Sequence, residues 1–437
     1  METLSSGEKE KLQLERLQKT VESVYENVPF YKNKFREKKV EPKDIKSLED
    51  LQKLPFTVKK DFRQNYPFGL FAKPVRETKR IHASSGTSGK PTVVGFTTND
   101  LGVWGDIVAR AIAACGGEPG GILHNAYGYG LFTGGLGIHY GSEKLGMVTV
   151  PVSTGNTERQ ITLIEDFQPT VITGTPTYVL NIAEKIEKRG IDPRNTSLKY
   201  GIFGAETWSE EMRYTLESRL DIKAMDIYGL SEVMGPGIAV ECKEAQDGLH
   251  IADDHFLAEV INPDTLDPAE EGEEGELVFT SLTKEALPII RYRTGDLASI
   301  TKEPCLCGRT SIRMSRVKGR IDDMLIIGGV NVFPSEIESV LLEVEELAPH
   351  YQIVIKLDGV MDKIVVKVEI NERFYQSING NMEHEKIEFL SNVISKKLKS
   401  RCLVTINVEF ETPWNMPRSE GKAIRIIRDT ESSLITN

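Results

Sequence analysis

The stretch Ser84-Ser85-Gly86-Thr87-Ser88-Gly89-Lys90-Pro91 concentrates hydroxyls, glycines and one lysine in a short segment of the chain. Backbone N–H groups of such a loop can converge on an anion, because glycine allows close approach and positive-φ turns. The hydroxyls add donors, and Lys90 carries a positive charge toward the outer phosphates. The common NTPase loop is spaced differently, since here two residues separate Gly86 from Gly89 and proline follows the lysine. The stretch predicts a loop that binds polyphosphate, with a flexible connection as the alternative.

Around this loop, short apolar runs alternate with helical stretches. The runs rich in β-forming residues lie at 92–96, 146–152, 170–173, 200–203 and 223–228, and the helical stretches at 157–166 and 177–189. This alternation is typical of βαβ units and a mainly parallel sheet. Between 248 and 300 the strands become shorter, with glycine and acidic turns, which indicates a β subdomain. We therefore predict an α/β fold class.

A boundary is predicted at Gly319-Arg320-Ile321-Asp322-Asp323. Beyond it we expect helices from 335 and 383, and strands at 352–357, 363–370, 404–411 and near 423. These about 115 residues are enough for an independent α+β domain. We therefore expect a large N-terminal domain, 1–320, that binds nucleotide and acid, and a small mobile C-terminal domain, 321–437. At the N-terminus, 9–38 has the spacing of an amphipathic helix that ends near Asn27-Val28-Pro29.

The composition limits the partners. Of 437 residues, 39% are apolar and 27% charged, which is ordinary for a soluble globular protein. The net charge of −11 repels nucleic acid and anionic membranes. No apolar run approaches the roughly 20 residues of a membrane helix, and the first residues are too charged for a secretion signal. We therefore expect a cytoplasmic protein with neither nucleic-acid nor membrane partners, whose five cysteines are thiols or metal ligands.

Four potential metal ligands flank the β subdomain: Cys242, His250, Cys305 and Cys307. Three thiolates and an imidazole would complete a tetrahedral structural zinc site that joins distant strand ends. His255 could replace His250, and the C-x-C spacing is tighter than usual. The alternative is four unrelated buried residues, since free cysteine behaves as a small hydrophobe. The sequence predicts structural zinc, with Cys115 and Cys402 as core residues.

Further motifs follow the loop in order along the chain. They are Gly204-Ala205-Glu206, Tyr228-Gly229-Leu230-Ser231-Glu232, Arg291-Tyr292-Arg293-Thr294-Gly295-Asp296, Gly319-Arg320-Ile321-Asp322 and Pro417-Arg418-Ser419-Glu420-Gly421-Lys422. This ordered set resembles the adenylate-forming ligases.

Within that superfamily the chain is similar to the phenylacetate–CoA ligases, from about Leu12 to Ile427. The stretches that carry this similarity are Leu54-Pro55-Phe56-Thr57-Val58-Lys59-Lys60-Asp61, Tyr66-Pro67-Phe68-Gly69, Ala126-Tyr127-Gly128-Tyr129-Gly130-Leu131-Phe132-Thr133-Gly134-Gly135 and Pro304-Cys305-Leu306-Cys307-Gly308-Arg309. Ser88 and Phe62 depart from the usual Thr and Leu, and neither change removes a needed functional group.

The resemblance implies a reaction in two steps. Phenylacetate, or a related arylacetate, would attack the α-phosphate of ATP, and pyrophosphate would leave. The thiolate of coenzyme A would then displace AMP to give the thioester. Both steps depend on positioning and electrostatics more than on acid–base work. The expected partners are small molecules, namely Mg²⁺·ATP, an aryl acid and CoA, and related enzymes suggest a homodimer.

The resemblance also assigns roles to residues. The catalytic positions would be Lys422, which reaches the α-phosphate and the acid, and Glu232, the Mg²⁺ ligand. Tyr228 would stack on adenine and Asp296 would accept hydrogen bonds from the ribose. Asp322 aligns with the hinge of the superfamily, with Asp323 as a competing candidate, and Gly328-Gly329 would approach the CoA thiol. The full set of ATP- and AMP-binding positions is Ser84, Ser85, Gly86, Thr87, Ser88, Gly89, Lys90, Gly204, Ala205, Glu206, Tyr228, Gly229, Ser231, Asp296 and Arg320.

An acyl pocket is expected from aromatic and glycine residues: Tyr127, Tyr129, Phe132, Gly134, Gly135 and Gly235. Aromatic faces suit a ring and glycines leave room for it, although these side chains could instead pack the sheet. Larger arylacetates, such as indoleacetate or hydroxyphenylacetate, stay open. Two other functions stay open as well: a ligase that loads a carrier-protein thiol, and a non-catalytic nucleotide-binding homologue. The latter would be expected to lose Lys422, Glu232 or Lys90, all of which are present.

Overall fold

A computed structural model describes residues 1–84, 90–327, 330–358 and 361–429. The chain folds into two compact units. The first contains Met1–Gly174, Asn195–Ala205 and Ile222–Val317, and the second contains Thr175–Arg194, Glu206–Asp221 and Lys318–Asn437. Because the second unit includes two segments from the middle of the chain, the predicted division at residue 320 stays a prediction.

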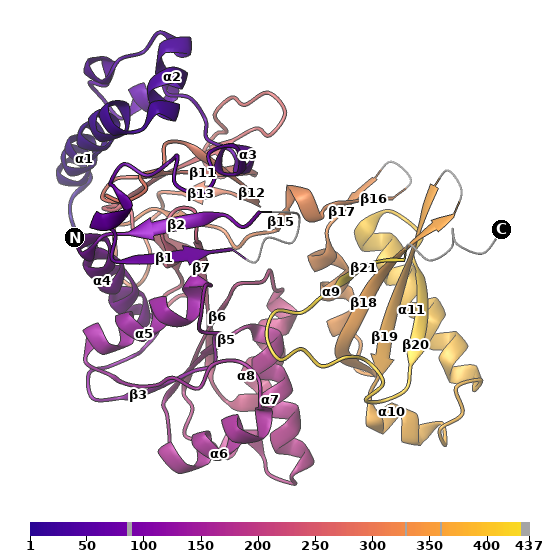
Figure 1. Ribbon diagram of the computed structural model, residues 1–437. Helices are drawn as coiled ribbons and strands as arrows, with labels where there is room; N and C mark the ends of the chain where they lie inside the picture. Colours follow the sequence, from indigo (N-terminus) through magenta and orange to yellow (C-terminus); the bar gives the residue numbers. More distant parts are fainter. Residues whose placement is uncertain (85–89, 328–329, 359–360, 430–437) are drawn as a thin grey trace. The chain divides into compact units, whose positions relative to one another are not determined.

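The first unit is built on a large mixed sheet (Figure 1). Within the described residues its strand order is β13-β14-β9-β8-β7-β6-β5-β3-β4. The bounds of these strands are β3 Ile122–Asn125, β4 Val148–Val150, β5 Val171–Gly174, β6 Tyr200–Gly204, β7 Lys223–Leu230, β8 Gly235–Val240, β9 Leu249–Ile251, β13 Ile300–Thr301 and β14 Arg313–Met314. Strands β4, β3, β5, β6 and β7 are parallel, and the pairs from β7 to β13 are antiparallel.

Helices α4 (Thr98–Ala114) and α5 (Thr133–Leu145) pack against each other and against β8, and α6 (Thr157–Phe167) follows β4 in the chain. The N-terminus of α4 is capped by Thr97, whose side chain accepts from the N–H of Asp100 at 3.0 Å. Trp104 and Val108 of α4 are buried in the core. Trp104 Nε1 also donates to Pro236 O at 3.1 Å, so α4 is held against β8.

Smaller elements complete the first unit. Strands β10 (Phe256–Ile261), β11 (Gly275–Ser281) and β12 (Tyr292–Ala298) pair antiparallel, and so do β1 (Arg80–Ala83) and β2 (Val93–Phe96). The N-terminal region forms α1 (Ser6–Asn27) and α2 (Pro29–Lys38), and α3 (Lys59–Gln64) follows. The region 9–38, predicted to be helical, therefore contains two helices. Pro29 takes the first position of α2, where its missing N–H costs no hydrogen bond.

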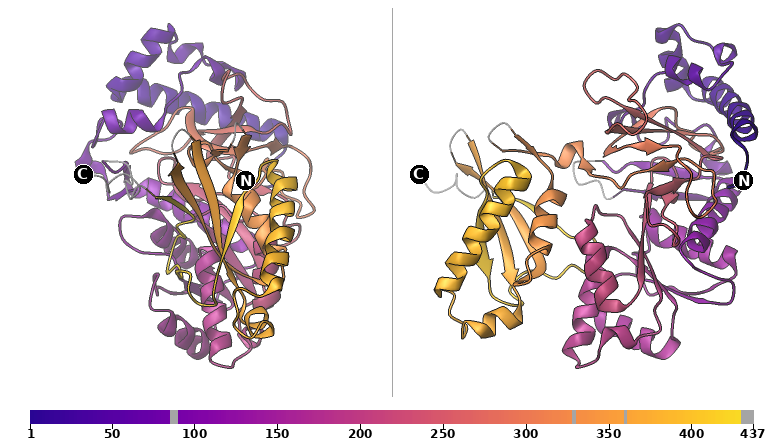
Figure 2. Two further views of the ribbon diagram at one scale, coloured as in Figure 1. Left: turned by 90° about the vertical axis from the view of Figure 1, so that its right-hand side faces the viewer. Right: turned by 180° about the vertical axis from the view of Figure 1, so that it is seen from behind.

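The second unit centres on a sheet of order β20-β19-β18-β21, one face of which carries α11 (Figure 2). Its further bounds are α7 Pro176–Lys188, α8 Glu210–Leu220, β15 Gly319–Arg320, β16 Leu325–Ile327, β17 Val330–Val332, α9 Pro334–Leu342, β18 Leu347–Asp358, β19 Met361–Ile370, α10 Glu372–Ser377, α11 Glu385–Cys402, β20 Asn407–Glu411 and β21 Ile426–Asp429. Ile353, Val366 and Ile394 are fully buried in its core.

The α/β fold class predicted from the sequence is confirmed. In the described part of the chain, no helix is both long enough and apolar enough to cross a membrane.

Candidate active site and metal centre

The predicted phosphate loop closes the β1–β2 hairpin. Ala83 pairs with Val93, so residues 84–92 connect the two strands. Ser84 and Thr92 hold the base of the connection, since Ser84 N–H donates to Thr92 O and Thr92 N–H donates to Ser84 Oγ, both at 3.0 Å. Lys90 is exposed, with its Nζ 5.0 Å from the centre of the Tyr66 ring. Ser85, Gly86, Thr87, Ser88 and Gly89 lie outside the described residues, so their role stays a prediction.

Tyr228 and Asp296, predicted to contact adenine and ribose, are hydrogen-bonded to each other. Tyr228 lies on β7 and Asp296 on β12, and the tyrosine hydroxyl donates to Asp296 Oδ2 at 2.7 Å. The Tyr228 ring stacks on Phe279 with centroids 6.0 Å apart. Asp296 is buried, and its N–H donates to Thr294 Oγ1 at 3.0 Å. The fold therefore joins two residues that are far apart in the sequence and fixes the carboxylate at one edge of the aromatic ring.

Glu232 lies on a tight turn between β7 and β8. A Cβ at Gly229 would be 1.9 Å from Gly235 O, so only glycine fits where the two strands diverge. Gly235 has φ +137°, and a Cβ there would be 2.4 Å from the Trp104 ring. Ser231 is buried, with its Oγ 3.0 Å from Thr133 Oγ1. This turn holds the half-buried Glu232 in place, and its role as a Mg²⁺ ligand stays a prediction.

The predicted Gly204-Ala205-Glu206 motif crosses the boundary between the two units. In the first unit Gly204 ends β6, and Ala205 has a positive φ of 68°. In the second unit, the Glu206 carboxylate accepts from Thr177 N–H at 2.9 Å and Thr177 Oγ1 at 2.6 Å. It also accepts from Ala423 N–H at 3.1 Å. Burial raises the pKa of Glu206.

Lys422 is exposed on a segment whose backbone is anchored on both sides. Thr175 Oγ1 donates to Gly421 O at 2.8 Å, and the next residue, Ala423, donates its N–H to Glu206. The Lys422 side chain itself makes no hydrogen bond or ion pair with any residue that the structure describes. In the same unit, Arg320 is half-buried at the start of a short 3-10 helix, Ile321–Asp323, on which Asp322 and Asp323 are both exposed.

Charged residues to which the sequence analysis gave no role support this segment from within the second unit. Arg418 binds Glu369 through its Nη2 at 2.7 Å. His350 Nε2 lies 2.8 Å from Glu184 Oε2, and both side chains are buried. Glu184 and His350 are 166 residues apart, so no local pattern indicates the pair.

The aromatic, glycine-rich segment predicted to form the acyl pocket is organised by Asn125, at the end of β3. Asn125 Nδ2 donates to the Tyr129 hydroxyl and to Gly135 O, both at 2.8 Å. The Tyr129 hydroxyl is also 3.1 Å from His139 Nδ1, and burial raises the pKa of Tyr129 to about 12. Asn125 was missed, although a polar residue after a buried strand run is a recognisable signal.

The remaining predicted pocket residues differ in exposure. Tyr127 is buried, whereas Phe132 is 44% exposed at the start of α5. A Cβ at Gly135 would be 2.5 Å from Gly128 O, and one at Gly134 would be 2.3 Å from the Phe132 ring. These glycines therefore allow the segment to fold back on α5, and contact with a substrate ring stays a prediction.

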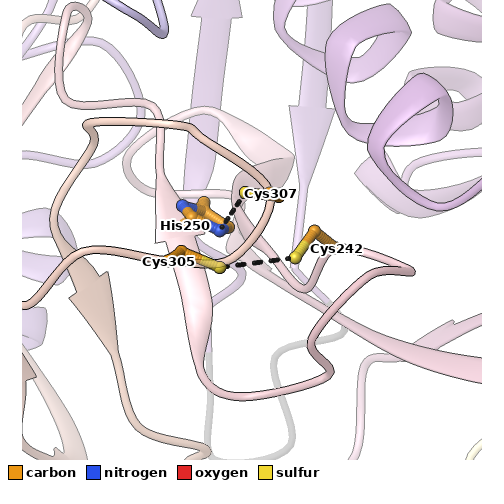
Figure 3. Close-up of side chains that lie close together, drawn as sticks. All are labelled: Cys242, His250, Cys305 and Cys307. Atoms are coloured by element: carbon orange, nitrogen blue, oxygen red, sulfur yellow. Dashed lines mark hydrogen bonds between the residues drawn. The ribbon is translucent and has the colours of Figure 1, made fainter.

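The four predicted metal ligands lie together (Figure 3). Their donor atoms, from Cys242, His250, Cys305 and Cys307, all lie within 4.8 Å of one another. The Sγ atoms of Cys242 and Cys305 are 3.7 Å apart, and Cys307 Sγ is 3.3 Å from His250 Nε2. His250 Nδ1 lies 3.0 Å from Ser311 Oγ, which leaves Nε2 directed at the thiols.

His255, the alternative ligand, is engaged elsewhere. Its Nδ1 lies 2.8 Å from Thr283 Oγ1, and its Nε2 lies 3.2 Å from Asp254 Oδ2. The two remaining cysteines, Cys115 and Cys402, are buried in the cores of the first and second units.

The loop that carries Cys305 and Cys307 also holds the first residues of the chain. Thr310 N–H donates to Glu2 O at 2.8 Å, and Thr310 Oγ1 donates to Leu4 O at 2.7 Å. Lys9 of α1 donates to Thr310 O at 2.6 Å and forms an ion pair with Asp253 at 2.9 Å. The N-terminal segment and the cysteine loop therefore support each other.

Comparisons with known proteins find relatives over nearly the whole chain. Residues 17–283 match the family model of the AMP-binding enzymes, and residues 329–430 match that of the AMP-binding enzyme C-terminal domain. The chain is 51% identical to a phenylacetate-coenzyme A ligase of Thermus thermophilus, with 98% of each chain covered. It is 50% identical to a phenylacetate-coenzyme A ligase of Escherichia coli, over 98% of this chain and 96% of that one.

The fold is also similar to solved structures. A 2-hydroxyisobutyryl-CoA ligase in its postadenylation state, in complex with 2-HIB-AMP, matches with a TM-score of 0.92 and 29% identity. The match covers 98% of this chain and 91% of that one.

Proposed function

Because the chain belongs to the family of AMP-binding enzymes, as a nearly full-length relative of phenylacetate-coenzyme A ligases, we propose that it is an ATP-dependent acid–thiol ligase. It activates phenylacetate, or a related arylacetate, as the acyl-adenylate with release of pyrophosphate. It then transfers the acyl group to CoA and releases AMP. The observation that carries this proposal is the 51% identity over 98% of the chain.

The first step needs a nucleotide held at both ends. Tyr228 offers a ring face to adenine, while Asp296, fixed by the Tyr228 hydroxyl, accepts from the ribose hydroxyls. The loop between β1 and β2 binds the β- and γ-phosphates. Lys422 supplies a positive charge to the α-phosphate and the attacking carboxylate, where charge develops in the transition state. Its lack of a partner among the described residues supports this role, because no ion pair must be broken first.

Magnesium suits the turn between β7 and β8. Mg²⁺ prefers one or two carboxylates together with phosphate oxygens, and Glu232 offers a half-buried carboxylate on a backbone held by Gly229 and Gly235. When bound, the ion neutralises part of the phosphate charge. The protein's contribution is to hold the Glu232 carboxylate at a fixed place.

The second step requires that Lys422 give way to the CoA-binding face. We place the hinge at Asp322, which is exposed on the short 3-10 helix that follows β15. Gly328 and Gly329, which lie outside the described residues, are the proposed approach to the CoA thiol.

A structural zinc ion fits the cysteine–histidine cluster. A tetrahedral ion with Zn–S bonds of about 2.3 Å places two sulfurs about 3.8 Å apart, and Cys242 and Cys305 are 3.7 Å apart. Ser311 orients the His250 ring, as residues behind a metal ligand commonly do. Because the four donors would fill all positions of a tetrahedral zinc ion, the proposed role is structural. Metal analysis of protein prepared without chelators or histidine tags tests it, and a stoichiometry near zero contradicts it.

The test of the whole proposal is an assay of pyrophosphate exchange and AMP release over a panel of aryl and aliphatic acids. Each acid is offered alone, with CoA, and with a phosphopantetheinylated carrier protein. We expect exchange with phenylacetate before any thiol is added, and AMP turnover with CoA. Turnover only with the carrier protein would reassign the acceptor. Absence of exchange with every acid would indicate a non-catalytic homologue.

We also propose that the ligase works in the cytoplasm as a homodimer. The acidic net charge and the small-molecule substrates support the location. Light scattering of the purified protein at several concentrations measures the assembly, and a constant monomer mass contradicts it.

A further inference from the structure

One side of helix α7 carries polar residues for which the reaction described above has no use. Asn181, Glu184 and Lys188 are three and four residues apart, so they lie one above another on the helix. Asn181 is 2% exposed and Glu184 is 7% exposed. Burial of an amide or a carboxylate costs free energy unless a partner binds it. The partners of these side chains therefore indicate the role of this side of the helix.

Each of these side chains contacts a residue of the segment 414–423, which carries Lys422, and so does Thr175, the N-cap of α7. In the order of the segment, the contacts are Trp414 with Lys188 at 2.9 Å from ring centre to Nζ, Arg418 with Glu184 at 3.4 Å from Nε to Oε2, Ser419 with Asn181 at 3.3 Å from O to Nδ2, and Gly421 with Thr175 at 2.8 Å from O to Oγ1. Residue numbers rise along the segment as they fall along the helix, so the two are antiparallel. We call Thr175, Asn181, Glu184 and Lys188 the α7 polar face.

Glu184 is the most highly connected residue of the α7 polar face. Besides Arg418, its carboxylate lies 2.8 Å from His350 Nε2 on β18 and 3.4 Å from Arg219 Nη1 on α8. Arg418 in turn donates to both carboxylate oxygens of Glu369 on β19, at 2.7 and 2.8 Å. All five residues belong to the second unit. Such buried, directional ion pairs are suited to fixing one arrangement of the chain.

The arrangement that these contacts fix includes the backbone of Lys422. Thr175 binds Gly421 O, and Glu206 accepts from Ala423 N–H at 3.1 Å, so both neighbours of Lys422 are held. A slip of one residue in an extended segment moves a side chain by about 3.3 Å. Misplacement of a catalytic group by about 1 Å can already slow a reaction about 10²-fold. The register of the segment on α7 therefore decides whether Lys422 can act.

We propose that Glu184 is a positioning residue for adenylation. Together with the rest of the α7 polar face, it fixes the register of segment 414–423 and thereby the place from which Lys422 reaches the α-phosphate and the acid. This role requires no contact between Glu184 and a substrate. The contacts are polar, so water can replace them when Lys422 gives way in the second step. The inference rests on the proposed function, from which it takes the role of Lys422.

The first measurement is the rate of pyrophosphate exchange with phenylacetate and Mg²⁺·ATP. Glu184→Gln keeps the shape of the side chain and removes the charge that holds Arg418. We expect kcat for exchange to fall about 10- to 10²-fold, because Lys422 is misplaced. The KM of each substrate should stay within about twofold, because the interactions that bind them are kept. Thioester formation from synthetic phenylacetyl-adenylate and CoA should keep its wild-type rate.

The matched control is Glu187→Gln, the same change at an exposed position of the same helix. Glu187 contacts Arg219 at 3.9 Å and lies outside the α7 polar face. This variant should have wild-type rates in both half-reactions. Circular dichroism confirms that each variant is folded.

A double variant separates positioning from general damage to the fold. If Glu184 acts through Lys422, Glu184→Gln should slow exchange in the wild-type background and change it less than about twofold in the Lys422→Ala background. A residue that only stabilises the fold would slow exchange by the same factor in both backgrounds.

A second measurement is independent of activity. Hydrogen exchange of the peptide 414–424 reports whether the segment lies on α7, because Ala423 N–H is bonded to Glu206 there. We expect this peptide to exchange about tenfold faster in Glu184→Gln, since a buried charge pair is broken, and at the wild-type rate in Glu187→Gln. Asn181→Leu removes one donor to the segment and should shift both measurements in the same direction by a smaller factor. It takes the place of Glu184→Gln should that variant not fold.

Equal slowing of exchange in the two backgrounds overturns the inference, and so does unchanged hydrogen exchange of the peptide 414–424 in Glu184→Gln. Absence of pyrophosphate exchange by the wild-type protein with every acid would instead contradict the proposed function. In that case the hydrogen-exchange comparison still decides whether Glu184 holds the segment.

Discussion

The cysteine–histidine cluster and the Lys422 segment differ in how their side chains are placed. In the cluster, four donor atoms from separate parts of the first unit lie within 4.8 Å of one another. At Lys422, the second unit anchors the backbone on both sides and leaves the side chain exposed. The proposed metal ligands already lie together in the structure, whereas the side chain proposed to act on the substrate is exposed. Geometry alone therefore identifies the first kind, and the second needs sequence order as well.

The largest expected effect is on the rate of adenylation when Lys422 is replaced. Lys422→Ala should lower the rate of adenylation at least 10²- to 10³-fold, because a charge aimed at the transition state is lost. Thioester formation from synthetic phenylacetyl-adenylate and CoA should stay within about twofold of wild type, on the order of experimental scatter. Pyrophosphate exchange and single-turnover thioester assays measure the two steps.

Lys399→Ala, at an exposed lysine on α11, is the matched control and should be active in both steps. If Lys422→Ala slows both half-reactions equally, Lys422 is not dedicated to the first step, and the contrast with the preassembled cluster fails.

The next effect concerns the assembled cluster. Cys305→Ser should abolish zinc binding and lower the free energy of unfolding by about 3 kcal/mol or more, since loss of a structural metal is among the severe classes of change. Metal analysis and denaturant titration measure both quantities. His255→Gln is the control and should keep the metal, because His255 contacts Thr283 and Asp254 instead. Full stability of zinc-free Cys305→Ser would contradict the structural role.

A smaller effect is expected for the pair that is proposed to contact the nucleotide. Tyr228→Phe removes the hydroxyl that donates to Asp296, and Asp296→Asn removes the proposed acceptor of the ribose hydroxyls. Each should weaken binding of Mg²⁺·ATP by about 1–3 kcal/mol. The double variant should lose less than the sum, because the two residues form one unit. If the loss of binding free energy in the double variant equals the sum of the losses in the two single variants, the hydrogen bond does not contribute to nucleotide binding.

The smallest effect concerns Glu206, which anchors the backbone beside Lys422. Burial raises the pKa of this carboxyl above its unfolded value, so its contribution to stability is fully present below the unfolded pKa and is lost as pH rises through the folded pKa. Glu206→Gln does not titrate and should be less sensitive to pH over the mildly acidic range. Thermal unfolding of both proteins across that range measures this, and parallel curves would contradict it.

Much of the fold could be predicted because its local signals are strong. The predicted strands at 170–173 and 200–203 correspond to β5 and β6, and the helix at 157–166 corresponds to α6. Apolar runs and turn residues indicate such elements without tertiary information. The β1–β2 hairpin could be inferred only in part, because the strand at 80–83 is short and partly exposed.

The site residues that belong to sequence motifs could be predicted. Those whose position depends on pairing between distant strands could not. The cysteines could be proposed from their spacing, but the choice of His250 over His255 depends on strand register. β9 pairs with β14 so that His250 lies opposite Arg313, close to the loop of Cys305 and Cys307. Asn125 and the His350–Glu184 pair were missed because neighbouring residues do not indicate what a buried polar group will contact.

The hydrogen bonds from Thr310 to Glu2 and Leu4 have a practical consequence for anyone who produces this ligase. An affinity tag fused ahead of Met1 would place extra chain beside the cysteine loop, where a polyhistidine sequence would compete for the proposed zinc ion. A cleavable tag at the opposite terminus avoids both problems and makes measured metal contents interpretable.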